Sequence, residues 1–153
     1  FTGTVTGAGG VNTPAFFASC TGDQVVNNET TTKVTYSNEV YDVGGVYDHS
    51  TNYRFTPTVA GEYFVFIRMR WDTGSSMTAG QVSIYKNGSK ISKEVAPQTA
   101  AQTHILTHTV TLDADDYIEA YCYQNTGGNA PIDGGAAETQ DAGLFGAFRI
   151  TGV

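Results

Sequence analysis

The stretch Tyr47–Phe66, YDHSTNYRFTPTVAGEYFVF, carries the strongest indication of how this chain folds. It reads as a hairpin that leads into a buried strand, because Pro57 and Gly61 interrupt an otherwise aromatic and β-branched run. After Gly61 the side chains alternate with the period of a strand. The two sets are Tyr63, Val65, Ile67 and Met69, and Phe64, Phe66, Arg68 and Arg70. We expect the first set to face the interior and the second to lie on the opposite face of the sheet.

Length and composition indicate one domain of a turn-rich, extended kind. A chain of 153 residues is long enough to bury roughly two-thirds of its unfolded surface. Its 18 glycines and its low share of charged residues, 15%, are typical of strands joined by many turns. The net charge of −7 and the scattering of only eight basic residues argue against a nucleic-acid partner.

The ends of the chain suggest a folded head preceded by a short tail. Residues 1–12 are rich in Gly and Thr and lack a core pattern, so we interpret them as a lead-in from a stalk or as a free tail. Residues 13–153 then form the head domain. No apolar run approaches the ~20 residues of a membrane span, and no signal peptide is recognisable. The Thr- and Asn-rich composition suits an extracellular, cell-surface or virion-surface protein.

Strand patterns recur along the chain, and no helix is convincing. Asn87-Gly88 stands between two strand-like runs and is a strong hairpin signal, because both turn positions need positive φ. Residues 93–104 could be helical, but Pro97 interrupts them. The expected strands are Ala15–Ser19, Thr32–Ser37, Tyr53–Phe55, Glu62–Trp71, Val82–Tyr85, His104–Leu112, Tyr117–Tyr123 and Gly143–Thr151. About eight to ten strands without helices predict an all-β sandwich or barrel.

The two cysteines leave two interpretations open. A disulfide between Cys20 and Cys122 would indicate an oxidising compartment. Two free thiols would instead behave as small buried hydrophobes. The alternation of Ile118, Ala120 and Cys122 suits an inward-facing thiol and favours the second interpretation.

Five short motifs follow one another along the chain: Pro14-Ala-Phe-Phe-Ala18, the Tyr47–Tyr63 segment, Val82-Ser-Ile-Tyr-Lys-Asn-Gly88, Leu112 with Asp116-Tyr-Ile118, and Phe145-Gly-Ala-Phe148. In this order they resemble the globular heads of complement first-component subunit q and of the tumour necrosis factor superfamily. The sequence departs from the family at Asp115 and Ala147, where the family usually has Gly. The Asn- and Gly-rich style of Tyr123–Gly128 resembles the bacterial and bacteriophage branch.

The resemblance implies an antiparallel, two-sheet jelly roll of about ten strands that forms a homotrimer at the tip of a fibrous or collagen-like stalk. Phe64 and Phe66 fit this implication, because contiguous apolar side chains on an outer face usually mark an interface. We expect the interface to contain Phe64, Phe66, Arg68, Arg70 and Phe148, with acidic partners for the arginines from a neighbouring copy. The alternative is that a loop of the same chain covers the two phenylalanines.

Catalytic and metal-binding patterns are weak. The three histidines, His49, His104 and His108, lie in no recognisable Ser–His or Cys–His context, so we predict no enzyme activity and no cofactor. Asp113, Asp115 and Asp116 cluster in one turn and offer the hard oxygen ligands that calcium prefers. A solvated acidic turn without metal is the favoured interpretation.

Two functions remain after these exclusions. The first is a fibre head that attaches to a cell-surface glycan or protein, where Tyr123, Trp71 and Tyr41 could stack against sugars. The second is a purely structural role, as a trimerisation, capping, capsid or filament subunit that binds only itself. Neither function involves nucleic acid or membrane insertion.

Overall fold

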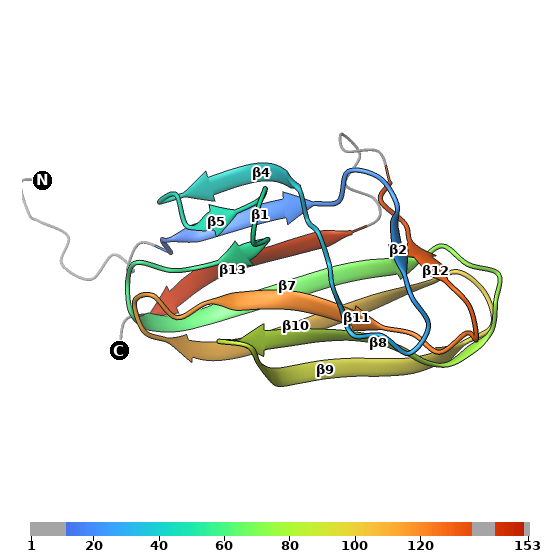
Figure 1. Ribbon diagram of the computed structural model, residues 1–153. Coiled ribbons are helices and arrows are strands. Elements are labelled where there is room, and N and C mark those ends of the chain that lie inside the picture. Colours follow the sequence, from blue (N-terminus) through green and yellow to red (C-terminus); the bar gives the residue numbers. More distant parts are fainter. Residues whose placement is uncertain (1–11, 136–142, 152–153) are drawn as a thin grey trace, which may run out of the picture.

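Two antiparallel sheets form the domain in the computed structural model, which describes residues 12–135 and 143–151 (Figure 1). The seven-stranded sheet has the order β2 (Gln24–Val26), β12 (Ala130–Ile132), β7 (Gly61–Trp71), β13 (Leu144–Thr151), β1 (Ala15–Ser19) and β4 (Asn38–Val43), with β10 (Gln102–Leu112) also paired to β7. The six-stranded sheet has the order β5 (Tyr47–Asp48), β6 (Arg54–Phe55), β11 (Ile118–Tyr123), β8 (Met77–Lys86) and β9 (Ser89–Gln98), with β3 (Thr32–Lys33) paired to β11. The all-β, two-sheet prediction is confirmed.

The strand β7 alternates as the sequence predicts. Its odd-numbered residues from Tyr63 to Trp71 are fully buried, whereas the even-numbered residues are only partly covered. The buried set joins apolar side chains of both sheets in one core, which removes apolar surface from water. β7 lies inside the seven-stranded sheet, paired with β10, β12 and β13. Because successive side chains of a strand point to opposite faces, the even-numbered side chains of β7 emerge on the outer face of this sheet.

An aromatic cluster around Phe16 joins the two sheets. The Phe16 ring stacks on Tyr47 and Phe55 at centroid distances of 4.3 and 4.9 Å, and it meets the edge of Phe145 at 4.9 Å. Phe16 and Phe145 belong to the seven-stranded sheet, whereas Tyr47 and Phe55 form a pair in the six-stranded sheet. Offset and edge-on aromatic contacts of this kind add to the gain from burial.

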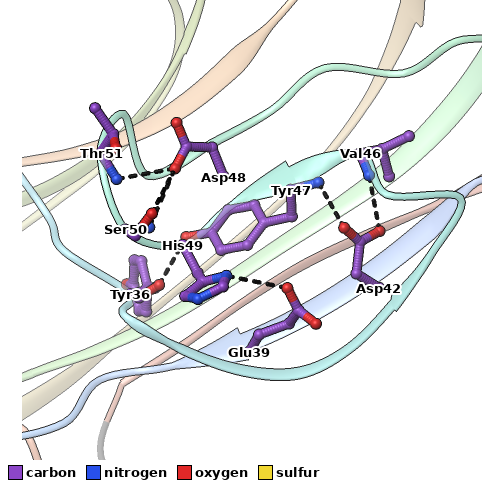
Figure 2. Close-up of polar contacts among 9 residues, drawn as sticks. All are labelled: Tyr36, Glu39, Asp42, Val46, Tyr47, Asp48, His49, Ser50 and Thr51. Atoms are coloured by element: carbon purple, nitrogen blue, oxygen red, sulfur yellow. Dashed lines mark hydrogen bonds and ion pairs between the residues drawn. The ribbon is translucent and has the colours of Figure 1, made fainter.

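The Tyr47–Thr51 segment is held by local hydrogen bonds (Figure 2). Both oxygens of Asp42 accept backbone N–H groups, from Val46 and Tyr47, at 2.9 Å each. The Tyr47 hydroxyl donates to the carbonyl of Tyr36, which is also drawn in Figure 2, at 2.9 Å. Burial alone would raise the pKa of Asp48, but hydrogen bonds from the Thr51 backbone and the Asn52 side chain hold it well below its usual range. The segment therefore has a structural role.

The observed strands differ from the expected ones in number and length. The described residues form thirteen strand segments rather than about ten, because β2, β3, β5, β6 and β12 have only two or three residues. The Asn87-Gly88 hairpin is confirmed between β8 and β9, with both residues at positive φ. Residues 93–104 form no helix. Residues 93–98 belong to the edge strand β9, where Pro97 is tolerated, and residues 102–104 begin β10.

Candidate functional site

A row of aromatic rings crosses the outer face of the seven-stranded sheet. The Phe66 centroid lies 5.9 Å from that of Phe17 on β1 and 6.4 Å from that of Phe64. Phe64 in turn lies 5.5 Å from Phe148 on β13, and Phe17 lies 5.9 Å from Tyr41 on β4. We call Tyr41, Phe17, Phe66, Phe64 and Phe148 the aromatic face. It brings together three predicted interface residues, Phe64, Phe66 and Phe148.

Gly146 makes room for this row. The strand register places Gly146 directly between Phe17 and Phe66, on the strand that separates theirs. A Cβ atom on Gly146 would lie 2.3 Å from the Cζ atom of Phe66, which is closer than two carbon atoms approach without a bond. The Phe66 ring therefore lies over the backbone of β13 and reaches toward Phe17.

Exposed aliphatic side chains extend the aromatic face on both sides. Val43 on β4, on the same side of the strand as the 45% exposed Tyr41, is 46% exposed, and Ile105 on β10, opposite Arg68, is 64% exposed. Four of the five aromatic rings, all but Tyr41, are partly buried by one another and by neighbouring strands. A contiguous apolar surface of this kind is typical of a protein interface. The geometry therefore favours association through this face.

The two predicted interface arginines do not both need partners from another copy. Arg70 forms an ion pair with Asp133 of the same chain, which lies at the end of β12. The expectation that Arg70 requires an acidic neighbour is thus wrong, because a loop residue 63 positions away in the sequence supplies the carboxylate. Arg68 lies on the same outer face, opposite Leu144 of β13.

The three residues proposed to stack on sugars are not brought together. Trp71 is fully buried at the end of β7 and cannot present its ring to a ligand, so its assignment as a stacking residue is wrong. The alternation that places Tyr63 in the core also places Trp71 there. Tyr41 lies in the aromatic face, whereas Tyr123 lies on β11 of the other sheet, opposite Gln81.

The three clustered aspartates serve the turn between β10 and β11. Asp116 accepts hydrogen bonds from the Asn87 side chain at 2.7 Å and the Asp113 backbone N–H at 2.9 Å, and it forms an ion pair with Lys86 at 2.8 Å. The hydrogen bond from Lys86 is the main reason that the pKa of Asp116 falls to about 2. Within residues 12–135 and 143–151, no group of three or more His, Cys, Asp or Glu side chains could hold a metal ion. Asp113, Asp115 and Asp116 thus do not converge as a calcium site. Asp141, another loop carboxylate, lies outside the described residues.

Two of the histidines pair with carboxylates. His49 Nδ1 lies 3.1 Å from Glu39 Oε2, as drawn in Figure 2. His104 is buried on β10 and contacts Glu94 and Gln98 of β9. These contacts orient the rings and involve no Ser or Cys nucleophile.

Both cysteines are free and buried, as the alternation around Cys122 suggests. Burial raises the pKa of each thiol to about 12, and Asp133 adds to the effect at Cys20. Such thiols are inert and pack as small hydrophobes.

No protein-family model matches this chain, and no curated protein matches its sequence. Solved structures do match it over most of its length. Eiger TNF from S. frugiperda superposes with a TM-score of 0.68 and 9% identity over 91% of this chain and 93% of that one. The globular domain of zebrafish complement 1qA protein superposes with a TM-score of 0.61 and 13% identity over 92% of this chain and 100% of that one. Murine APRIL at pH 8.0 superposes with a TM-score of 0.64 and 11% identity over 88% of this chain and 97% of that one.

This chain shares its fold with these three proteins. The prediction of a jelly roll like that of the complement and tumour necrosis factor heads is therefore confirmed for the fold. At 9–13% identity the likeness extends to the fold alone. The bacterial or bacteriophage branch stays a prediction.

Sequence reasoning missed two residues that shape the aromatic face, Phe17 and Gly146. Phe17 follows the buried Phe16, and adjacent strand residues point to opposite faces. The dipeptide therefore held the signal that Phe17 lies outside. Gly146 could not be interpreted without the register between β1, β13 and β7, which joins segments far apart in the sequence.

Proposed function

We propose that this domain is the homotrimeric, non-enzymatic head of a surface or virion fibre, and that it attaches to a cell-surface glycan or protein. The observation that carries the proposal is the aromatic face, together with the exposed Val43 and Ile105 beside it. A monomer would leave this surface in water, whereas a closed ring of three copies would cover it. The occupant we propose for the face is a second copy of this chain.

The arrangement of the strand ends supports a head carried on a stalk. β1 begins and β13 ends on the left of Figure 1, at the end of the sandwich where β7 starts. The opposite end holds the end of β7, the start of β8 and the connection between β9 and β10. If residues 1–12 lead in from a stalk, this opposite end faces outward.

Chemistry and composition support a binding role outside the cell. The described histidines that have partners are paired with carboxylates or an amide rather than with a nucleophile. Among residues 12–135 and 143–151 there is no helix long and apolar enough to cross a membrane. The low share of charged residues and the abundance of Gly favour an extracellular or virion-surface setting.

Sedimentation equilibrium and cell binding together test the proposal. A species of three times 16.3 kDa at micromolar concentration is expected, and a fluorescent form of it should bind a glycan array or intact cells. A monomer would refute the trimer. A trimer that binds no glycan and no cell would refute the attachment role and leave the structural role, a trimerisation, capping, capsid or filament subunit that binds only itself.

A further inference from the structure

A cavity of about 450 Å³ opens at the end of the sandwich opposite the start of β1. The start of β8 forms one wall with Met77 and Thr78. The end of β9 and the start of β10 form the other with Pro97, Gln98 and Gln102. The volume lies in the range of small-molecule sites, ~300–1,000 Å³. Trp71, the β7 residue that pairs with the lining residue Gln102, is seven residues from Phe64, which is about 23 Å at the usual rise of a strand. The cavity is therefore well away from the centre of the aromatic face.

A buried polar atom without a protein partner belongs to a residue that lines this cavity, and a second lies nearby. Among the described residues, only Trp71 Nε1 and Gln98 Nε2 are buried side-chain nitrogen or oxygen atoms with no hydrogen-bond partner. Gln98 is 4% exposed and lines the cavity. Trp71 does not line the cavity but is close to two residues that do: it pairs with Gln102, and its Nε1 and the Met77 sulfur both lie beside Gly80. Buried donors are nearly always satisfied, so the unpaired Gln98 amide in the cavity lining indicates a missing partner, a ligand or a water.

The buried groups around Gln98 are held in place. Gln98 Oε1 lies 3.3 Å from Nε2 of His104, whose other ring nitrogen contacts Glu94. The packing around Gly80 is tight, because a Cβ there would lie 2.8 Å from the Met77 sulfur and 3.1 Å from both His104 Nε2 and Trp71 Nε1. Gln98 therefore presents its amide from a rigid support.

The wall of the cavity is also ordered. Asn125 accepts a hydrogen bond from the Ala79 N–H at 2.9 Å and donates to Thr78 Oγ1 at 2.7 Å. This bridge ties the start of β8 to the loop after β11. Ordered walls of this kind reduce the conformational entropy that the protein loses when it binds a ligand.

The lining chemistry matches a neutral, polyhydroxylated ligand. The described residues that line the cavity carry amides and hydroxyls, with Met77 and Pro97 as apolar surface, and none of them is charged. A hydroxyl both donates and accepts, so it complements the Gln98 amide in either orientation. A saccharide supplies several hydroxyls and an apolar C–H face. An anionic sugar would find no cation in this lining.

We propose that this cavity is a binding site for a neutral saccharide, with the Gln98 amide as the group that recognises a hydroxyl. The inference rests on the proposed function, because it names the ligand class and the site of the attachment head. The cavity lies at the end that would face outward on a stalk. The nearby tryptophan, the only one in the chain, provides a unique signal for it.

Nuclear magnetic resonance titration tests the site directly. The probes are the methyl glycosides of glucose, galactose, mannose and N-acetylglucosamine, added to the assembled protein. At least one is expected to shift both the Trp71 indole N–H and the Gln98 side-chain amide signals. Gln98→Met should weaken this binding by about tenfold, the loss of one neutral hydrogen bond.

A second pair of variants separates binding from folding. Thr99 is exposed and lines the cavity, so Thr99→Trp should fill the space and abolish the shifts while sedimentation and circular dichroism stay unchanged. Thr51→Trp, at an exposed position away from the cavity, should bind as the parent does. Equal binding by Gln98→Met or Thr99→Trp, or no response to any probe, would overturn the site. If cells or arrays still bind in that case, the proposed function stands without it.

Discussion

Gly146 determines where the Phe66 ring lies, and a single added methyl group tests this. In Gly146→Ala the new Cβ would lie 2.3 Å from Phe66 Cζ and 3.0 Å from the Phe16 carbonyl oxygen, so the ring must move. We expect the free energy of unfolding in urea to fall by about 1–3 kcal/mol, the usual cost of overpacking. Gly74→Ala is the matched control, because a Cβ there meets nothing within 4 Å, and it should stay near the parent. Equal stability of the two variants would contradict the close approach.

The two thiols provide a second test at the residue scale. Because burial raises the pKa of Cys20 and Cys122 to about 12, almost no thiolate forms at mildly alkaline pH in the native state. A thiol reagent should therefore leave both unmodified until denaturant is added, and then report two free thiols. Mass spectrometry of the alkylated protein provides the count. A disulfide, or rapid modification of native protein, would contradict the structure.

At the scale of elements, β7 shows why the sequence predicted the fold well. Its alternation runs through the whole strand, so one register places every side chain on a face. The hairpin at Asn87-Gly88 was equally local. β2 and β12 are too short for a period to be recognised, and β4 is a mostly exposed edge strand without a buried stripe. These strands form because distant segments offer hydrogen bonds.

The candidate site was less predictable than the fold for the same physical reason. Phe64 and Phe66 follow from alternation within one strand. The Arg70–Asp133 ion pair and the fit of Phe66 over Gly146 join segments that only the folded chain brings together. The cavity near Gln98 depends on three such segments, which no local pattern marks.

We expect the free energy of unfolding to depend on pH through Asp116, in the turn between β10 and β11. The pKa of Asp116 is lowered from 3.8 to about 2, chiefly by the hydrogen bond from Lys86. The unfolded state therefore binds the proton first, and the stability that Asp116 contributes above pH 3.8 is lost as pH falls toward 2. Asp116→Asn should be less stable at neutral pH and lose less on acidification. Urea unfolding across this range measures both slopes, and parallel slopes would contradict the assignment.

We expect metal removal to leave the unfolding temperature unchanged, because of the contacts within this same turn. Asp116 is occupied by Lys86, Asn87 and the Asp113 backbone, so it has little capacity left for calcium. Thermal unfolding should occur at the same temperature with a chelator and with added calcium, because a ligand that bound only the native state would raise it. A clear rise with calcium would show that a metal site exists.

For the whole molecule, the central question is what covers the aromatic face. Val43, Tyr41 and Ile105 are 46%, 45% and 64% exposed, and the phenylalanine rings beside them are only partly covered. Threefold association of the heterologous kind would repeat this surface around an axis and close without leaving an open end. A segment of the same chain over the face would make the domain a monomer instead.

Replacing Phe64 and Phe66 together decides between these possibilities. Each half-buried ring still has about 1 kcal/mol to gain, less than the roughly 1.5–3 kcal/mol of a fully exposed side chain, and a trimer repeats each gain three times. Phe64→Ser with Phe66→Ser should therefore shift sedimentation from trimer to monomer while the circular dichroism of the sandwich persists, since Tyr63, Val65 and Ile67 still fill the core. Val95→Ser, which removes a 44% exposed side chain from the other sheet, is the control and should stay trimeric. If the double variant stays trimeric as well, association uses another surface, and the aromatic face loses the role proposed for it.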